Sequence, residues 1–373
     1  MARSGLYIHV PFCVRKCGYC DFCSVGIGDG DEALTGRMVD ALVQEMERVD
    51  RNDAVTVFIG GGTPSVLPVG QMEQLLKSVR ERVIEAPEEF TVECNPGTVD
   101  EEKLSLFLEY GVNRLSIGCQ SAQDEELRSL GRIHNWTDFL DGYESARKIG
   151  FENINVDLMT AIPGQTEDSL KQTLEKVIDL QPEHLSVYSL IIEEGTPFFD
   201  RYGETPPVDE ETDRGMYEVT CRMLGEAGFR HYEVSNYAKP GYECRHNRNY
   251  WKRGNYVGIG PAASSHRDGI RRTNIRDWEA YMRCIEKGED SVEEAEVLTA
   301  EQKLLETLYL GLRTADGIRI SELEKEYSGN YRSEWDLPLR DFAEEGLLVY
   351  DGDAVSLTEQ GLWVSDTIIG QLM

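Results

Sequence analysis

Short apolar runs alternate with amphipathic stretches over residues 6–192 of this 373-residue chain. Six runs have the length of strands and are rich in β-branched or aromatic residues: 6–10, 54–59, 90–94, 114–119, 154–159 and 185–192. The stretches between them repeat apolar residues three and four positions apart, as in 38–49 and 71–84. The stretch 166–180 opens with Thr166, a residue suited to capping a helix. The pattern predicts six strand–helix units.

Successive strand–helix units imply parallel strands joined by right-handed crossovers, which is the α/β fold class. Eight units close a TIM barrel, so six predict an open, incomplete (β/α)6 barrel. Functional side chains in such folds gather on the loops that follow the strands. We therefore expect a site at the carboxyl ends of the six strands.

The pattern changes after residue 192. The stretches 193–198, 238–251 and 254–266 are rich in glycine, proline and aromatic residues and are typical of loops. Helices are expected over 299–312, 320–327 and 339–346, followed by a β-hairpin that turns at 351–353. We expect a barrel over 1–235, a linking region over 236–295 and an α+β, winged-helix-like C-terminal domain over 296–373.

Acidic residues strongly outnumber basic ones, and the formal net charge is −30. Phosphate backbones need a basic surface, so we expect no nucleic-acid partner, and the C-terminal domain is expected to pack or dock instead. No apolar run reaches the ~20 residues of a membrane span, and the N-terminus lacks the apolar stretch of a signal peptide. These features indicate a cytoplasmic protein with reduced thiols.

Four of the nine cysteines fall within residues 13–23. Reduced thiols disfavour a disulfide cluster, and a zinc finger needs a second pair of ligands that does not follow here. Cys13, Cys17 and Cys20 have the spacing C-x3-C-x2-C, and three such thiolates can hold three irons of a cubane cluster while the fourth iron stays open. From the spacing alone, a redox pair or chance crowding remains an alternative.

Polar residues and glycines also follow the later strands. Gly60, Gly61 and Gly62 come after the second strand, where bare backbone allows close approach of a ligand. Glu93, Gln120 and Asp157 stand at or just past the ends of the third, fourth and fifth strands. Because these ends share one face with the cysteines, the sequence predicts a small polar ligand across the barrel mouth.

The C-x3-C-x2-C motif, with Tyr19 before its last cysteine, resembles the radical S-adenosylmethionine (SAM) superfamily. The resemblance implies a 4Fe–4S cluster on Cys13, Cys17 and Cys20 and SAM at the open iron. It also implies that the reduced cluster cleaves SAM to a 5′-deoxyadenosyl radical, with the protein positioning the cofactor and excluding water.

Within that superfamily, the segments "GLYIHVPFC", "GGGTPS", "GCQS", "LGRIH" and "VDLMTAIPGQT" resemble the coproporphyrinogen III dehydrogenase branch. This resemblance covers nearly the whole chain. It implies a set of SAM-contacting residues: Tyr7, Tyr19, Gly61, Gly62, Thr63, Glu93, Gln120, Arg132 and Asp157. The dehydrogenase has a fourth cysteine shortly after the third. Here the next cysteine is Cys23, which we expect to face the interior or the cluster edge without binding iron.

The stretch "HNRNYW", residues 246–251, resembles the H-N-x-x-Y-W signature of the HemW heme chaperones, relatives of the dehydrogenase. An imidazole can bind heme iron, so His246 is the expected ligand. Tyr250 and Trp251 offer flat faces for a porphyrin, and Asn247 offers hydrogen bonds. His9, His266 and Cys244 are expected to have no such role. Four further cysteines are expected to be small buried residues: Cys94, Cys119, Cys221 and Cys284.

The resemblance implies a heme chaperone that delivers heme to apo-hemoproteins such as respiratory enzymes, with a tendency to form homodimers. Its cofactors would be a 4Fe–4S cluster, SAM and heme, and its electron donor and catalytic residues are not identified. Whether SAM is cleaved, and hence whether the protein is an enzyme, stays open. The alternatives are an oxygen-independent coproporphyrinogen III dehydrogenase and a radical SAM heme-degrading methyltransferase.

Overall fold

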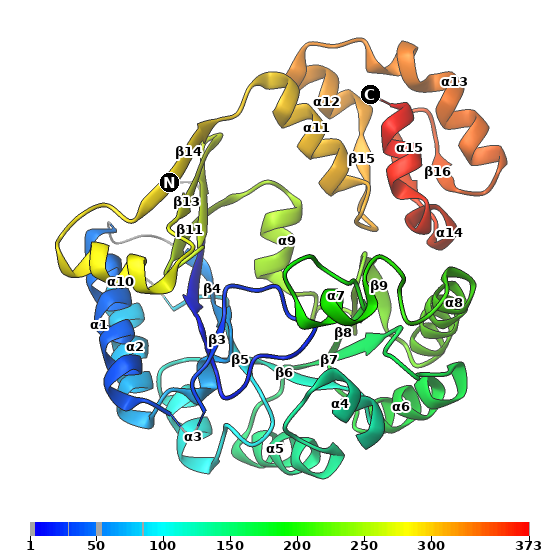
Figure 1. Ribbon diagram of the computed structural model, residues 1–373. Coiled ribbons are helices and arrows are strands. Elements are labelled where there is room, and N and C mark those ends of the chain that lie inside the picture. The colour runs from blue at the N-terminus through cyan, green and yellow to red at the C-terminus, as the bar shows by residue number, and fades with distance from the viewer. Residues whose placement is uncertain (1–3, 29, 50–53, 84–85, 373) are drawn as a thin grey trace.

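The computed structural model describes residues 4–28, 30–49, 54–83 and 86–372 and is built around one large sheet (Figure 1). Six parallel strands form its centre, in the order in which they occur in the chain: β1 (Ser4–Val10), β4 (Ala54–Gly61), β5 (Glu89–Cys94), β6 (Arg114–Gln120), β7 (Ile154–Thr160) and β8 (His184–Ser189). All six predicted strands are confirmed, and so is the incomplete barrel.

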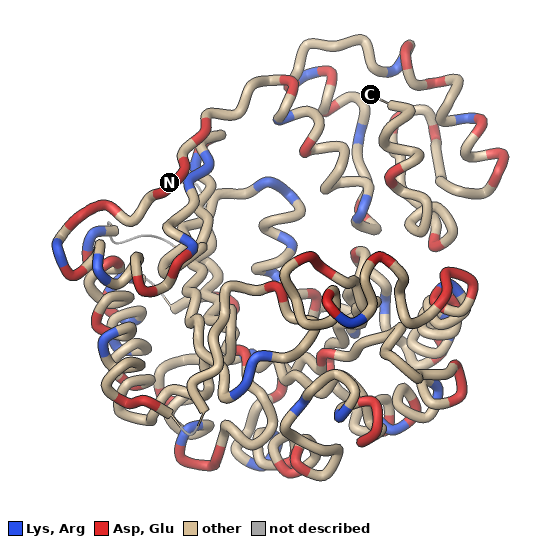
Figure 2. Tube along the Cα trace, in the orientation of Figure 1, with Lys and Arg blue, Asp and Glu red and all other residues tan. Residues whose placement is uncertain are grey.

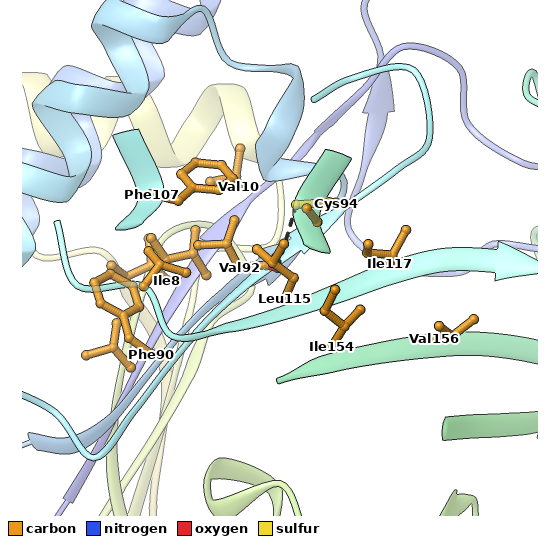
Figure 3. Close-up of a cluster of buried hydrophobic side chains, with 14 of the residues drawn as sticks. Ile8, Val10, Phe90, Val92, Cys94, Phe107, Leu115, Ile117, Ile154 and Val156 are labelled. Atoms are coloured by element: carbon orange, nitrogen blue, oxygen red, sulfur yellow. Dashed lines mark hydrogen bonds between the residues drawn. The ribbon is translucent and has the colours of Figure 1, made fainter. Parts of the chain in front are cut away.

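The strands alternate between two environments. Val92 and Cys94 of β5 and Leu115 and Ile117 of β6 lie in one buried apolar cluster, which Figure 3 shows together with side chains of β1 and β7. The residues between them, such as Glu93, face the other side of the sheet, because successive side chains of a strand point to opposite faces. The apolar face packs on helices, and the polar face lines the barrel interior.

The helices cover the outer side of the curved sheet (Figure 1). They are α1 (Glu32–Arg48), α2 (Val69–Arg82), α3 (Glu101–Glu109), α4 (Asp124–Leu130), α5 (Trp136–Ile149), α6 (Glu167–Asp179) and α8 (Glu210–Glu226). Thr166 caps α6 as predicted. Its side chain accepts a hydrogen bond from the Ser169 N–H, and the Ser169 hydroxyl accepts one from the Thr166 N–H. The helix predicted over 71–84 is α2, although Ile84 lies outside the described residues.

The prediction of loops over 193–198, 238–251 and 254–266 is wrong in part. These stretches include all or part of α7 (Pro197–Tyr202), α9 (Arg245–Trp251), β11 (Asn255–Ile259) and β12 (Ser264–Arg267). β11 pairs in parallel with β1 and so adds a seventh parallel strand. β12, β13 (Ile270–Asn274) and β14 (Val292–Val297) continue antiparallel from it. At the other edge β8 pairs with β10 (Asn236–Ala238), which pairs with β9 (Arg230–Glu233). These elements depend on partners far away in the sequence, which a local pattern cannot indicate.

The C-terminal unit has its own apolar cluster, which includes Leu312, Leu339 and Val355. The predicted helices are α11 (Ala300–Gly311), α12 (Ile320–Tyr327) and α13 (Tyr331–Glu344), of which the last begins eight residues earlier than expected. The predicted hairpin is β16 (Leu348–Tyr350) and β17 (Ala354–Leu357), joined at its edge by β15 (Ile318–Arg319). Two further helices, α14 (Glu359–Trp363) and α15 (Ser365–Gln371), were not predicted.

Acidic residues are spread over the outer helices, and α9 carries basic residues between the barrel and the C-terminal unit (Figure 2). In the part of the chain that the structure describes, no helix combines the length and the apolar character that crossing a bilayer requires.

Candidate functional site

The loop that carries the cysteines starts at the carboxyl end of β1. Its two ends are joined by a short parallel pair, β2 (Phe12–Cys13) with β3 (Val25–Gly26). The N–H groups of Ile27 and Gly28 donate to the carbonyls of Cys13 and Val14, at 2.9 and 3.0 Å. The backbone therefore fixes the loop at both ends and brings Cys13, Cys17 and Cys20 to one side of the barrel mouth.

Polar groups approach the sulfur atoms. The Thr63 hydroxyl donates to Cys13 Sγ at 3.4 Å, and Nη1 of Arg132 donates to Cys17 Sγ at 3.6 Å. Burial raises the pKa of the Cys13 thiol, and the nearby Cys20 and Cys17 raise it further. The three sulfurs are thus close enough to repel one another as thiolates, and a cationic group is needed to hold them together in that form.

The spacing of the thiols does not suit a single metal ion. Among the described residues, only one group of three His, Cys, Asp or Glu side chains has its ligand atoms all within 4.8 Å of one another, and it contains none of these cysteines. Around one tetrahedral zinc ion the sulfurs would lie roughly 4 Å apart. The sulfurs of Cys13, Cys17 and Cys20 therefore do not all lie within 4.8 Å of one another.

Gly61, the last residue of β4, and Gly62 allow the chain to pass close to the cysteine loop. A Cβ atom at Gly61, where φ is +109°, would lie 2.5 Å from the His9 ring, and one at Gly62 would lie 2.6 Å from the Phe12 carbonyl oxygen. The N–H of Gly62 donates to the Val10 carbonyl, and the N–H of Thr63 to that of Phe12. The predicted residues Gly61, Gly62 and Thr63 therefore lie directly against the strand and loop that lead to Cys13.

A second polar group connects the cysteine loop to β5 and β6. Nη2 of Arg132 donates to Asn95 Oδ1 at 2.6 Å and to the Gly118 carbonyl at 2.9 Å. Nδ2 of Asn95 in turn donates to Thr63 Oγ1 at 2.6 Å. Gln120 lies beside this group, since a Cβ atom at Gly118 would lie 3.1 Å from its Nε2. Arg132, Thr63 and Gln120 were predicted from the sequence, whereas Asn95, which joins them, was missed.

The barrel interior contains a cavity of about 590 Å³. It is lined by three of the residues expected to contact SAM, Tyr7, Glu93 and Asp157, and by three of those expected to contact heme, His246, Asn247 and Tyr250. The structure thus brings parts of two separately predicted sites to one space. Tyr19 lies elsewhere, against Phe198 beside the cysteine loop.

Burial raises the pKa of both acids in this cavity. The pKa of Glu93 is raised to about 8 by burial and by the nearby Asp157, although the carboxylate accepts the Gly61 N–H at 3.0 Å. Burial also raises the pKa of Asp157, which accepts hydrogen bonds from Ser116 and Asn155. At neutral pH Glu93 can therefore donate a hydrogen bond as well as accept one.

His9 connects the cavity to the cysteine loop. Its Nε2 donates to the Cys23 carbonyl at 2.7 Å, which leaves Nδ1 to accept from the Tyr7 hydroxyl at 2.9 Å. The Cys23 thiol itself points the other way and donates to the Arg276 carbonyl at 3.1 Å. His9 thus has both ring nitrogens bonded, as expected for a buried histidine with a structural role.

His246 is buried on α9, with 1% of its surface exposed. Glu89 of β5 accepts the N–H groups of Arg245 and His246, both at 2.9 Å, and so caps the helix from a distant strand. Nδ1 of His246 lies 2.9 Å from Thr56 Oγ1, and its Nε2 lies 2.8 Å from the Tyr250 hydroxyl. Burial and the nearby Arg114 lower the pKa of His246 to about 3, so the ring is neutral.

The predicted heme-contacting residues do not all face one space. Trp251 lies outside the barrel cavity and lines a cleft of about 450 Å³ between the barrel and the C-terminal unit. Arg248 and Lys252 line the same cleft and form ion pairs with Asp316. Because 246–251 form a helix instead of the predicted loop, its residues point to opposite sides, and Trp251 cannot stack on a ligand beside His246.

Basic and polar residues inside the barrel were not predicted from the sequence. Arg114 is 2% exposed and lines the cavity, and its Nε atom has no hydrogen-bond partner among the described residues. At the cavity edge, Glu306 of α11 accepts from Arg253 and Arg271. The available signal was the alternation of polar residues within apolar strands, as at Arg114 and Ser116 of β6.

The remaining cysteines and histidine follow the predictions in most respects. Cys94, Cys119, Cys221 and Cys284 are buried, as is Cys244, which directly precedes α9. His266 lies on β12 and not in a loop, and its Nδ1 is 3.1 Å from the Gly254 carbonyl oxygen.

Comparison with known proteins agrees with this fold. A model of the radical SAM superfamily matches residues 7–177, and a model of the HemN C-terminal domain matches residues 298–364. The crystal structure of coproporphyrinogen III oxidase (HemN) from Escherichia coli superposes with a TM-score of 0.88 at 22% identity, covering 100% of this chain and 90% of that one. Fold and site therefore define a radical SAM protein with a HemN-type C-terminal domain.

Curated relatives show which family of radical SAM proteins the chain belongs to. The heme chaperone HemW of Lactococcus lactis is 34% identical over 99% of this chain and 97% of its own, and that of Bacillus subtilis is 35% identical over 98% of both chains. The heme chaperone HemW of Escherichia coli is 39% identical over 74% of this chain and 75% of its own. The chain belongs to the HemW family.

Proposed function

We propose that this protein binds heme in its barrel, next to a SAM-ligated 4Fe–4S cluster, and transfers the heme to apo-hemoproteins. The observation that carries the proposal is the cavity of about 590 Å³, which is lined by Glu93 and Asp157 together with His246 and Tyr250. Its volume lies within the usual range for cofactor sites. The naming of curated relatives as heme chaperones supports the same role.

We assign the iron ligands to Cys13, Cys17 and Cys20. The donors Thr63 and Arg132 and the close approach of the chain at Gly62 suit a cluster at the carboxyl end of β1. When bound, the cluster and SAM would supply one-electron chemistry. The role of this chain would be to hold the cluster and to keep water from it.

We assign the SAM site to the residues between the cysteine loop and the cavity: Tyr7, Tyr19, Gly61, Gly62, Thr63, Glu93, Gln120, Arg132 and Asp157. Gly61 and Gly62 bring the chain against the loop that leads to Cys13, and Glu93 and Asp157 offer oxygen atoms to polar ligand groups. Among the residues assigned to the SAM site, Glu93 and Asp157 are the best supported, because both line the cavity.

We assign heme ligation to His246. Thr56 can accept the proton of Nδ1 and so leave a lone pair on Nε2, which is the arrangement of an oriented metal-binding histidine. In the structure the Tyr250 hydroxyl lies 2.8 Å from this Nε2, so Tyr250 would move aside when heme binds. Asn247 lines the same cavity, whereas a contact of Trp251 with heme would require a second surface in the outer cleft.

We further propose that the chain divides near residues 235 and 295, because the barrel and the C-terminal unit have separate apolar clusters. The recipients would be apo-hemoproteins of the cytoplasm or of the respiratory chain, and a homodimer is the proposed assembly. Neither the electron donor nor the recipient has a residue signature in this chain.

The test is a heme titration of anaerobically reconstituted protein, followed by the Soret absorption. We expect saturation near one heme per chain, and a loss of affinity of at least about tenfold in His246→Ala. His184→Ala is the matched control, because His184 is as deeply buried as His246 but does not line the cavity. Equal binding by wild type and His246→Ala would overturn the heme site. Rapid conversion of coproporphyrinogen III would favour the dehydrogenase, and SAM-dependent loss of heme would favour a degrading methyltransferase.

A further inference from the structure

A second group of metal-binding side chains lies at the junction of the barrel and the C-terminal unit, away from the cysteine loop. Cys221 of α8, His231 of β9 and Glu359 of α14 each offer one ligand atom, and these atoms all lie within 4.8 Å of one another. We propose that these three side chains bind one zinc-like divalent cation, which joins the C-terminal unit to the barrel. This site is independent of the proposed function.

The donor atoms need only a small movement to reach a metal. Around a tetrahedral zinc ion with Cys, His and carboxylate ligands, donor atoms lie roughly 3.5 Å apart. Cys221 is buried, His231 is half-buried and Glu359 is exposed, so the group is open on the Glu359 side. His231 and Glu359 also line the cleft of about 450 Å³ that leads to solvent, which provides an entry path.

The surroundings of His231 prepare its ring for a metal. Its Nε2 lies 3.1 Å from the Val234 carbonyl oxygen, and a carbonyl can only accept, so Nε2 carries the proton and Nδ1 keeps a free lone pair. The ring also stacks on Tyr237, with centroids 4.2 Å apart and an angle of 10° between the planes. A hydrogen bond from the nitrogen that does not bind the metal, like that of Nε2 to the Val234 carbonyl, commonly orients a metal-bound histidine.

The neighbours of Cys221 and Glu359 hold these residues in place as well. The Cys221 sulfur lies 3.3 Å from the Tyr237 hydroxyl, which could donate to a metal-bound thiolate. The backbone carbonyl of Glu359 accepts from the Tyr217 hydroxyl at 3.3 Å. Tyr217 also contacts Trp363, the last residue of α14, so the helix that carries Glu359 is anchored to α8 at two points.

The chemistry of the set favours zinc among common cations. A thiolate, an imidazole and a carboxylate are all zinc ligands, whereas magnesium and calcium prefer oxygen ligands alone. A thiolate and a carboxylate together neutralise the charge of a divalent ion, and water can take the fourth position. Because the ligands come from both units, the bound ion would hold α14 against α8 and β9.

The experiment uses the full chain with Cys13, Cys17 and Cys20 replaced by alanine, so that the cluster loop does not compete for metal. Cobalt(II) is titrated anaerobically, and the near-ultraviolet thiolate-to-cobalt band reports a Cys ligand. We expect one equivalent of cobalt to produce the band, and zinc to displace it. Cys221→Ser should abolish the band, and Glu359→Gln should weaken binding at least about tenfold.

The control is Cys284→Ser, because Cys284 is as well buried as Cys221 but lies on α10 (Trp278–Glu286), outside the group. It should bind cobalt like its parent. As a second measurement, zinc should raise the melting temperature of the parent but not that of Glu359→Gln, which changes only an exposed side chain. Absence of a one-equivalent thiolate band, or cobalt binding by Cys221→Ser and Glu359→Gln as tight as that of the parent, would overturn the site. Should the triple alanine variant not fold, zinc content of cluster-loaded Cys221→Ser and Cys284→Ser decides, and equal zinc in both would overturn it.

Discussion

The Nε2 atom of His246 lies 2.8 Å from the hydroxyl oxygen of Tyr250, one helical turn further along α9. Two residues that the sequence suggested as partners in heme binding are thus bonded to each other, and Tyr250 occupies the nitrogen that heme iron would need. Ligand binding must therefore break this bond.

Replacing Tyr250 with phenylalanine should tighten heme binding. The change keeps the aromatic ring but removes the hydroxyl that competes for Nε2, and one hydrogen bond contributes about 1 kcal/mol, which corresponds to roughly fivefold in affinity. Heme titration of the variant measures the effect. Tyr256→Phe is the control, since Tyr256 packs against Tyr250 without a bond to His246. A loss of affinity in Tyr250→Phe as large as that in His246→Ala would contradict the competing role.

Replacing Glu93 with glutamine should make stability less dependent on pH. The pKa of Glu93 is raised from 4.5 to about 8 by burial and Asp157, so between these values the unfolded chain loses a proton that the folded protein keeps. The free energy of unfolding therefore falls as pH rises through this range. Above pH 8 Glu93 has lost its proton in both states, and the free energy falls no further on its account. Glutamine has no titrating proton, so its contribution to the free energy of unfolding does not change with pH. Its side-chain oxygen can still accept the hydrogen bond from the Gly61 N–H.

We expect the difference in unfolding free energy between Glu93→Gln and wild type to shift in favour of the variant by at least about 1 kcal/mol from pH 6 to pH 8. Urea denaturation of the protein without SAM measures it. Glu47→Gln, an exposed change on α1, is the control and should follow the wild type. Parallel pH profiles of Glu93→Gln and wild type would show that Glu93 is ionised in the folded protein at neutral pH.

Replacing Glu89 with glutamine should destabilise α9. The buried carboxylate accepts two N–H groups at the start of the helix, and glutamine has only one acceptor oxygen and no charge. We expect a loss of about 1–3 kcal/mol in unfolding free energy, together with weaker heme binding because His246 is no longer held. The neighbouring Glu88→Gln removes an exposed ion pair with Arg245 and should cost less than about 1 kcal/mol. Equal losses in both variants would contradict the capping role.

Elements defined by their own local sequence were predicted, whereas elements defined by contacts with distant parts of the chain were not. The six barrel strands were predicted because runs such as 90–94 are apolar and β-branched whatever their neighbours are. α9 was missed because its cap is Glu89, which lies more than 150 residues earlier, and no residue directly before the helix caps it with a side chain. β11 was missed for the same reason, since it is defined by pairing with β1.

The candidate site shows the same division. The loop cysteines and the residues at strand ends, such as Gln120, were predictable because the order of strands and loops places them at one face. The bonds of His246 to Thr56 and Tyr250, and the exclusion of Trp251 from the cavity, were not predictable because they depend on α9 being a helix. Arg114 was overlooked because an arginine at the start of an apolar run reads as a surface residue, whereas the barrel turns it inward.

Heme transfer is the most direct measurement of the proposed function. Anaerobically reconstituted protein is loaded with heme, mixed with an apo-hemoprotein, and followed by the Soret spectrum of the recipient while SAM cleavage products and porphyrins are assayed. We predict that heme moves intact to the recipient, that His246→Ala supports little transfer, and that coproporphyrinogen III added in place of heme is not converted. Turnover of coproporphyrinogen III to protoporphyrinogen, with no transfer of heme, would contradict the account.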